Sequence, residues 1–366
     1  MSFSLAPLPV PQMLETKTVL RKTTSAGRLL AELKGFALSI PNQNVLIDTL
    51  SIQEAKDSSA IENIVTTQDE LFMGQIFENI SPAAKEVRNY IHALRKGIEL
   101  ISRHKLLTVN HICEIQGMVE SEKPGFRKLP GTVLRNAATR EVVYTPPQHP
   151  DEIVALMGNL EKFINDESMA DLDPLVKMAV LHYQFESIHP FYDGNGRTGR
   201  IINVLYLALK GLLEIPVLYL SRHINRTRPD YYRLLQEVRT HGGWEAWVLY
   251  MLDAVEQTTR HTLRSIREIH AAMLDFKHRV RAAFPKIYSQ DLVNHLFSYP
   301  YTTIGFYERN LGVSRPSAVK YLNQLAGTGL LRCEKFGREY YFVNIALCGI
   351  LAKIDDPDML DSEKLN

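Results

Sequence analysis

The sequence predicts a mainly α-helical protein that carries a small β-hairpin and a separate C-terminal domain. Apolar residues recur at helical spacing on both sides of a glycine-rich loop, in residues 175–188 and 201–209. Two β-prone runs, residues 132–135 and 141–145, flank a polar turn and predict the hairpin. After residue 283 the pattern changes to three short helices and a strand-turn-strand, which indicates a second domain.

Changes in composition and periodicity divide the chain into segments. A proline-rich arm, residues 6–11, is expected to lie on the surface ahead of the first helices. The charged amphipathic stretch after residue 255 is typical of a connector helix or a homodimer helix. The expected segments are an N-terminal helical region (1–100), a core (101–255) with a hairpin (131–147) and a loop (189–200), a connector helix (256–283), a C-terminal domain (284–350) and a tail (351–366).

The bulk composition excludes several classes of protein. The net charge of +1 neither favours nor excludes a nucleic-acid partner. Three scattered cysteines, Cys113, Cys333 and Cys348, lack metal-ligand spacing and do not suggest a disulfide framework. The chain shows no secretion signal and no apolar run long enough to span a bilayer. We therefore expect a cytoplasmic protein without a membrane partner.

Residues 189–200 concentrate side chains suited to phosphoryl-type chemistry. His189 can act as a general base near neutral pH, and Asp193 offers the hard oxygen ligands that Mg²⁺ prefers. Arg197 and Arg200 lie three residues apart, so they share a helix face, and guanidinium groups grip phosphate oxygens in two-pronged fashion. The combination predicts a polyphosphate ligand rather than a lone carboxylate.

The backbone of the same loop is suited to binding an anion. Gly194 and Gly196 can turn N–H groups inward around Asn195, and a helix begins just beyond them. With Gly199 the glycines also spell a dinucleotide fingerprint, but that fingerprint follows a β-strand, whereas helical residues precede this loop. The plainer alternative is a tight interhelical loop in which His189 is only a cap, and the combination of residue types argues against it.

The stretch from His189 to Arg200 resembles the core motif of the Fic family, HPFx(D/E)GN(G/K)RxxR, at every specified position. The resemblance implies an α-helical bundle that transfers AMP from Mg-ATP to a hydroxyl side chain of a protein and releases pyrophosphate. It also implies that His189 takes the proton from that hydroxyl and that Asp193 is the magnesium ligand. The remaining motif residues would hold the phosphates of ATP: Asn195, Gly194, Gly196, Arg197 and, at the γ-phosphate, Arg200.

Residues 58–63 resemble the family's inhibitory signature, (S/T)xxxE(G/N), and imply an N-terminal inhibitory helix at about residues 50–66. Ser58 and Glu62 are four residues apart and would share one side of that helix, with Asn63 next to them. In the family this glutamate pairs with the arginine matched here by Arg200 and displaces the γ-phosphate. A guanidinium cannot donate the same pair of N–H groups to a carboxylate and to a phosphate at once. Without the core motif, the spacing would indicate only a solvated helix face.

The predicted hairpin resembles the family's flap, which would pair with an extended segment of a target and present its hydroxyl to His189. A plain surface hairpin would be the preferred interpretation without the motif. The expected target-positioning residues are Val142, Val143, Tyr144 and Thr145.

Tyr231 and Tyr232 resemble a YYxxL segment that commonly lies near the nucleotide base in this family. Aromatic rings stack well on flat heterocycles. Neighbouring residues on a helix point in different directions, so at most one of the two is expected to contact the base, and ordinary core packing is equally compatible with either.

Residues 284–350 are expected to form a winged-helix domain. The expected elements are helices around residues 291–297, 303–310 and 314–325 and strands at 330–334 and 338–344. If the third helix entered a major groove of DNA, four basic residues could meet phosphates: Arg315, Lys320, Lys335 and Arg338. Basic residues are few and acids are interspersed, and winged helices also bind proteins.

Two functions of different classes follow from the sequence. The first is an autoinhibited protein adenylyltransferase that uses Mg-ATP and modifies a Tyr, Thr or Ser hydroxyl on a target protein or on itself. The second is a nucleotide-sensing, DNA-binding regulator with weak or vestigial transferase activity, against which the intact His189 and Asp193 argue. Use of another nucleoside triphosphate stays open, because the predicted site in residues 189–200 recognises the phosphates better than it recognises the base.

Overall fold

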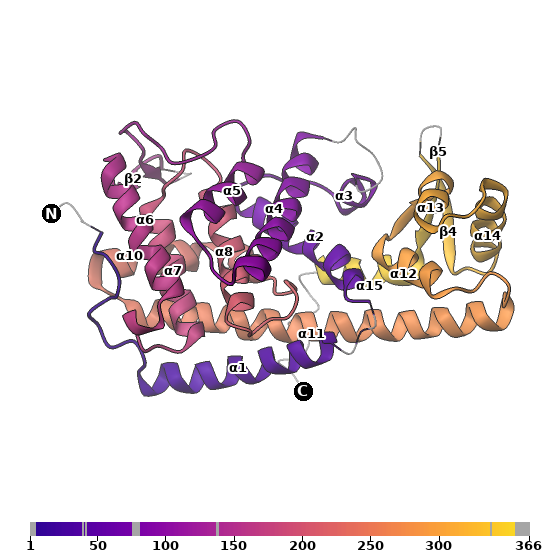
Figure 1. Ribbon diagram of the computed structural model, residues 1–366, viewed down its shortest axis with the longest axis horizontal. Helices are drawn as coiled ribbons and strands as arrows, with labels where there is room; N and C mark the ends of the chain where they lie inside the picture. The colour runs from indigo at the N-terminus through magenta and orange to yellow at the C-terminus, as the bar shows by residue number, and fades with distance from the viewer. Residues whose placement is uncertain are drawn as a thin grey trace.

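The computed structural model describes residues 5–38, 40, 42–74, 81–136, 139–336 and 339–355. Within these ranges the chain is mostly helical, as the sequence predicts, with one two-stranded and one three-stranded sheet. The molecule is elongated, with a helical core at one end and the smaller C-terminal domain at the other (Figure 1). Among the described helices, none is long and apolar enough to cross a membrane.

The N-terminal region and the core supply the helices that surround the motif loop. The N-terminal helices are α1 (Lys17–Leu38), α2 (Asn44–Ile61), α3 (Gln68–Gly74) and α4 (Pro82–His104). The core helices are α5 (Val109–Val119), α6 (Pro150–Asn165), the short 3₁₀ helix η1 (Glu167–Met169), α7 (Pro174–Ile188), α8 (Asn195–Leu209), α9 (Leu220–Arg226) and α10 (Arg228–His241).

Helix α7 lies at the centre of the core. Every residue from 175 to 188 is buried, so the helix is covered on all sides rather than along one stripe. It begins where the side chain of Asp173 accepts a hydrogen bond from the backbone N–H of Leu175, which caps the first turn. It packs against α8, and the motif loop joins the two helices. The loop is therefore held at both ends by buried helices.

The expected hairpin is present between α5 and α6. Strands β1 (Leu134–Arg135) and β2 (Val142–Tyr144) pair in antiparallel fashion, with Leu134 opposite Tyr144. Part of the turn between them, residues 137–138, lies outside the described residues.

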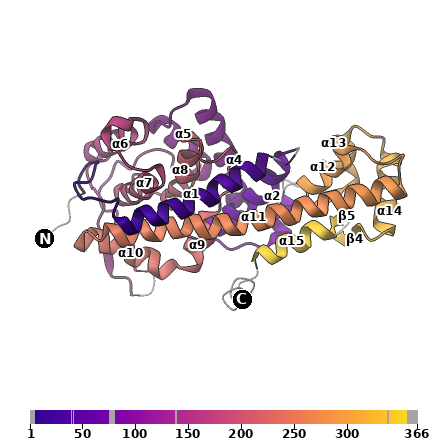
Figure 2. The same ribbon diagram turned by 90° about the horizontal axis from the view of Figure 1, so that it is seen from below.

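Helix α11 (Trp244–Ala283) is 40 residues long and runs from the core to the C-terminal domain (Figure 1). The sequence places a boundary between core and connector at residue 255, but the helix passes through that position without a break. The segment contains no glycine or proline, so nothing in it interrupts the backbone hydrogen bonds. Helix α1 lies alongside α11 in both views (Figures 1 and 2).

The C-terminal domain combines helices with a three-stranded antiparallel sheet of order β3-β5-β4. Its elements are α12 (Gln290–Ser298), β3 (Tyr301–Thr303), α13 (Ile304–Leu311), α14 (Arg315–Gly327), β4 (Leu331–Phe336), β5 (Glu339–Asn344) and α15 (Ile345–Asp355). The sequence did not indicate β3, which is only three residues long, or α15, which begins before the expected tail and packs against α11. Arg338 and residues 356–366 of the tail lie outside the described residues.

The C-terminal domain packs against the segment that carries the inhibitory signature. Helix α12 lies against α2. The Tyr301 hydroxyl donates a 2.6 Å hydrogen bond to Asp69 in α3, and the Tyr301 ring stacks on Phe72. The position of α2 is therefore fixed from the core and from the C-terminal domain together.

Trp247 anchors α11 on α7, since its fully buried indole donates from Nε1 to the carbonyl oxygen of Ala179 at 2.8 Å. We expect Trp247→Ala to lower the free energy of unfolding by about 3–5 kcal/mol, because it removes a large buried ring and leaves a cavity. Urea unfolding followed by circular dichroism measures the change. Leu274→Ala, at an exposed position of the same helix, is the control. Equal midpoints for the two variants would contradict the anchoring role.

Candidate active site

The motif loop is a short, braced turn between α7 and α8. His189, at the end of α7, adopts the left-handed conformation with φ 48° and ψ 59°, and Pro190 prevents the helix from continuing. Gly194, with φ 77°, starts α8 in a conformation that favours glycine. The Asn195 side chain holds the turn closed, since its Oδ1 accepts from the N–H of Phe191 and its Nδ2 donates to the Phe191 carbonyl, both at 2.9 Å.

The first turn of α8 provides an anion-binding position. No side chain caps this helix, so its leading amide groups and the positive end of its dipole face the loop. Gly196 lies in that turn, and a Cβ atom there would overlap Oε1 of Glu62 and approach the Arg200 guanidinium. The carboxylate of Glu62 therefore lies against the end of α8 where an anionic ligand would bind.

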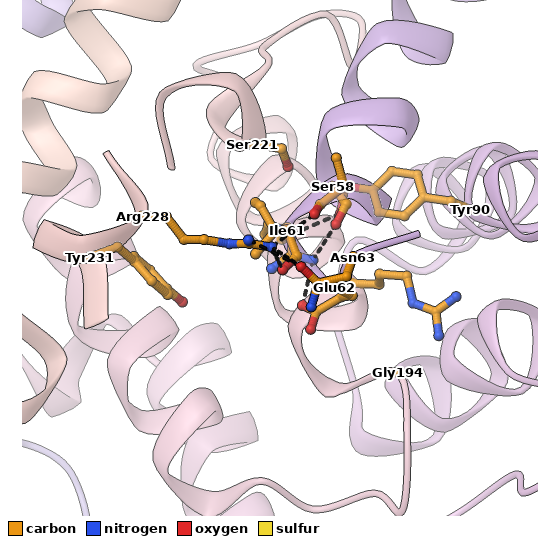
Figure 3. A network of polar contacts seen from close by, with 12 residues as sticks. Ser58, Ile61, Glu62, Asn63, Tyr90, Gly194, Ser221, Arg228 and Tyr231 are labelled. Atoms are coloured by element: carbon orange, nitrogen blue, oxygen red, sulfur yellow. Dashed lines mark hydrogen bonds and ion pairs between the residues drawn. The ribbon is translucent and has the colours of Figure 1, made fainter. Parts of the chain in front are cut away.

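The buried guanidinium of Arg200 contacts both Ser58 and Glu62, which lie close together at the end of α2 (Figure 3). The Arg200 side chain is 1% exposed; its Nε donates to Ser58 Oγ at 2.8 Å, and its Nη2 donates to Ser58 O at 2.9 Å and Glu62 Oε1 at 3.0 Å. Burial is the largest single effect and disfavours the charge of Arg200, but Glu62 and the other acidic and tyrosine side chains nearby together raise the pKa of the guanidinium above its ordinary value. Helix α2 ends at Ile61, earlier than the expected residue 66, so Glu62 reaches Arg200 from the helix cap.

Arg228 holds the end of α2, a role the sequence did not indicate. Its Nη2 donates to the carbonyl oxygen of Ala60 at 2.8 Å and also contacts that of Ile61. Both of its terminal nitrogens lie 3.3 Å from Asn63 Oδ1, and Asn63 has a left-handed backbone with φ 63° (Figure 3). A cation at a helix C-terminus satisfies carbonyls that have no partner in the helix. Asn63 thus fixes the turn that follows Glu62.

Glu54 fixes the middle of α2 to two neighbouring helices. Its buried carboxyl accepts from Tyr90 OH in α4 at 3.1 Å and from the Ser221 N–H in α9 at 3.1 Å, and the Ser221 hydroxyl also contacts it. Burial raises the pKa of Glu54 to about 8. The sequence carries a signal for this residue, because Glu54, Ser58 and Glu62 recur every four positions along one helix side.

His189 lies where α7 ends and the motif loop begins. Its Nδ1 is buried and has no hydrogen-bond partner among the described residues. Burial, with the nearby guanidinium of Arg127 as the next contribution, lowers the pKa of His189 to about 4. The imidazole is therefore neutral near pH 7, which is the form a general base requires.

Arg197 and Asp193 make a further set of contacts near the N-terminus of α8. The Arg197 side chain is buried; its Nη1 donates to Glu86 Oε2 at 2.6 Å, and its Nη2 lies 3.8 Å from both Glu120 Oε2 and Asp193 Oδ1. The Asp193 side chain is 66% exposed and accepts from the Gly194 N–H at 2.6 Å.

The donor set around Asp193 fits a magnesium ion that is held largely by its substrate. Among the residues that the structure describes, no group of three His, Cys, Asp or Glu side chains could enclose a metal. Mg²⁺ is commonly bound by one or two carboxylates together with phosphate oxygens and water. An exposed carboxylate beside a free helix N-terminus suits that mode of binding.

The two tyrosines of the α10 segment have different surroundings. Tyr231 is 2% exposed, and its hydroxyl lies 3.0 Å from His182 Nε2 within the core. Tyr232 is 50% exposed. Of the pair, only Tyr232 is placed to contact a ligand from outside the core.

The four expected target-positioning residues of the hairpin also differ in their exposure. Val142, Val143 and Thr145 are exposed along one edge of the hairpin, whereas Tyr144 is buried. The Tyr144 hydroxyl donates to the carbonyl oxygen of Ser187 at 2.9 Å, and the guanidinium of Arg239 from α10 lies 3.9 Å from the centre of its ring. Tyr144 therefore attaches the hairpin to the end of α7, and among the described strands only β1 pairs with β2.

Comparison with known proteins accounts for most of the chain. Residues 20–99 match the N-terminal region of the Fic/DOC family, and residues 106–207 match the Fic/DOC family itself. Residues 273–347 match the C-terminal domain of SoFic-like protein adenylyltransferases. The chain belongs to the Fic/DOC family.

Relatives and solved structures of this family are distant in sequence. Over 129 residues the chain is 30% identical to protein adenylyltransferase fic-1 of Caenorhabditis elegans. The aligned residues make up 35% of this chain and 22% of the relative. Over 159 residues it is 29% identical to protein adenylyltransferase Fic of Aedes aegypti, and the aligned residues make up 43% of this chain and 30% of the relative. The chain thus spans less than a third of the length of these curated relatives.

Two solved structures share the fold. A Fic family protein from Desulfovibrio desulfuricans G20 aligns with a TM-score of 0.59 at 20% identity, over 92% of this chain and 98% of that one. Fic-1 of Caenorhabditis elegans aligns with a TM-score of 0.53 at 21% identity, over 68% of this chain and 74% of that one.

The raised pKa of Glu54 makes stability depend on pH. A carboxyl whose pKa is higher in the folded than in the unfolded chain loses stabilising free energy as the pH rises from its ordinary value near 4.5 to about 8. We expect Glu54→Gln to remove this loss, so the stability of the variant relative to wild type should increase across that interval. Urea unfolding at a series of pH values measures it, with Glu99→Gln, on the exposed side of α4, as the control. A difference that does not change with pH would contradict the assignment.

Proposed function

We propose that this protein is an autoinhibited protein adenylyltransferase, which transfers AMP from Mg-ATP to a Tyr, Thr or Ser hydroxyl of a protein. The observation that carries the proposal is the 3.0 Å contact between Arg200 and Glu62 at the open N-terminus of α8. A buried arginine beside free helix amides is suited to phosphate, and here a carboxylate from another segment occupies it.

In the proposed reaction the target hydroxyl oxygen bonds to the α-phosphorus of ATP, and the bond from that phosphorus to the bridging oxygen of pyrophosphate breaks. The neutral imidazole of His189 takes the hydroxyl proton. The first amides of α8, together with Arg197 and Arg200, hold the phosphate oxygens on which charge develops. Magnesium held by Asp193 would neutralise charge on the departing pyrophosphate.

The proposed inhibition is a competition for Arg200. With Glu62 in contact, the guanidinium cannot grip the γ-phosphate, and the fixed carboxylate repels the nucleotide's charge. ATP would then bind without its phosphates in line for attack.

The exposed edge of the hairpin supports a protein substrate. Val142 and Val143 leave a strand edge open for pairing with an extended segment of a target or of another copy of the chain. Backbone pairing orders the segment and reads little of its sequence, so it can bring different hydroxyls to His189.

A DNA-binding regulator is the second candidate. The order α12, β3, α13, α14, β4, β5 is that of a winged helix, and Arg315 and Lys320 are exposed on α14. However, Arg315 lies 3.7 Å from Glu308, and Arg332 on β4 pairs with Glu334. Because these acids compensate part of the positive charge, the domain's surface favours the transferase proposal.

Removal of the inhibitory carboxylate is expected to activate the enzyme. Glu62→Gly should raise AMP transfer by at least about tenfold, since a charge-assisted contact contributes about 1.5–3 kcal/mol and each 1.4 kcal/mol is a factor of ten. Transfer is measured as label from α-labelled ATP with Mg²⁺ on the protein itself and on proteins of a cell lysate. Glu122→Gly, at an exposed loop position, is the control. Equal labelling by wild type and Glu62→Gly would contradict the inhibitory role.

Loss of the base is expected to stop the chemistry and spare binding. In the Glu62→Gly protein, His189→Ala should abolish labelling while the ATP dissociation constant stays within about threefold, because a base acts on the transition state more than on the bound ground state. Calorimetry measures the binding. If ATP binding is lost together with labelling, His189 is structural. If Glu62→Gly binds ATP but never labels protein, the nucleotide-sensing regulator becomes the better account.

A further inference from the structure

Arg127 is a buried arginine outside the motif whose donors surround the backbone of the catalytic histidine. It lies in the segment between α5 and the hairpin, 62 positions before His189, and is 1% exposed. Its neighbour Phe126 pairs with Phe191 in a single antiparallel bridge, which places the two segments side by side. No part of the motif pattern includes this arginine.

The hydrogen bonds of Arg127 satisfy the end of α7. Its Nε donates to the His189 carbonyl oxygen at 2.8 Å, and its Nη2 donates to that of Ile188 at 3.3 Å. Its backbone N–H donates to the Pro190 carbonyl oxygen at 2.9 Å. These are carbonyls that the end of a helix leaves without partners. A rotation of the left-handed His189 backbone would break them, so together they fix the direction in which the imidazole leaves the helix.

The same guanidinium also holds the hairpin. Its Nη2 contacts the carbonyl oxygen of Pro147, in the loop that joins β2 of the hairpin to α6. One rigid planar group therefore joins the histidine's backbone to the surface that would present the target hydroxyl. A lysine has the charge but a single nitrogen, and it cannot hold both sides in this geometry.

We propose that Arg127 is a positioning residue for AMP transfer, which fixes His189 relative to the hairpin that presents the target hydroxyl. The proposal rests on the proposed function. A base must lie within hydrogen-bond reach of the proton it takes, and a misplacement of about 1 Å can reduce the rate about a hundredfold.

The charge of Arg127 has a second, separable effect. Besides burial, Arg127 and Arg239 from α10 disfavour the imidazolium form of His189, whereas Glu62 and the backbone of Glu186 favour it. Removing the positive charge of Arg127 should therefore raise the pKa of His189, whereas replacing it by lysine keeps the charge nearby. Position and charge can thus be tested with two variants.

The experiment compares Arg127→Lys and Arg127→Met in the Glu62→Gly protein, with Lys128→Met at the exposed neighbouring position as the matched control. Initial rates of labelling from α-labelled Mg-ATP are measured against pH, and ATP binding is measured by calorimetry. We expect both Arg127 variants to lose about 10- to 100-fold in rate while ATP affinity changes by less than about threefold. Only Arg127→Met should move the acid limb of the pH profile upward. Lys128→Met should match the parent.

Three results would overturn the proposal. The first is a rate for Arg127→Met equal to that of its parent. The second is an equal loss of rate and ATP affinity in both variants, which would show a general structural role. The third is a lowered thermal midpoint with unchanged kinetics in Arg127→Lys, the variant expected to disturb folding least.

Failure of the proposed function is distinguishable from failure of this inference. If the Glu62→Gly parent labels nothing, the transferase proposal fails, and two readouts without transfer test Arg127. The first is the NMR titration of the His189 ring, assigned by its loss in His189→Gln. The second is hydrogen exchange of backbone amides in residues 141–148. Faster exchange in both Arg127 variants, with a raised His189 pKa only in Arg127→Met, supports the positioning role, and unchanged values overturn it.

Discussion

The contact between Arg200 and Glu62 is the interaction on which the rest of the site depends. A buried guanidinium is costly unless an anion and further acceptors satisfy it, and Arg200 obtains both from Glu62 and Ser58. The N-terminus of α8 adds free amides beside the same position. Either a carboxylate or a phosphate can supply the anion that the buried charge of Arg200 requires. In the proposed function, this exclusivity would connect a folded resting state to control of nucleotide binding.

The segment that is proposed to be inhibitory is supported along its length by different neighbours. Helix α12 of the C-terminal domain packs on α2, Glu54 ties its middle to Tyr90 and Ser221, and Arg228 holds its end. Glu62 itself belongs to the helix cap, and its side chain is 37% exposed. A cap residue can change its contacts by local backbone rotation, whereas the buried part of α2 would have to leave the core. The fold thus keeps the helix fixed, and the carboxylate that is proposed to inhibit lies at its partly exposed end.

The loop that is proposed to carry the chemistry is fixed by side-chain contacts to its backbone and to the end of α7. Asn195 closes the turn on Phe191, Arg127 satisfies the carbonyls around His189, and Tyr144 binds the preceding turn of α7. Two of these three contacts come from the hairpin or its flanks. The backbone that holds the base and the backbone that would hold the substrate are therefore one hydrogen-bonded unit, as catalysis by positioning requires.

Local sequence determined the helices, the hairpin and the motif loop, because helical periodicity, glycine and proline act over a few residues. The resemblance to a family signature indicated Ser58 and Glu62, and both contact Arg200 even though α2 ends before Glu62. Only the tertiary structure decided which of Tyr231 and Tyr232 is buried, and that Tyr144 anchors the hairpin while Val142 stays exposed. The roles of Arg127 and Arg228 belong to the same group. Their partners are carbonyl oxygens of segments distant in sequence, and a carbonyl carries no residue-specific pattern that a sequence could display.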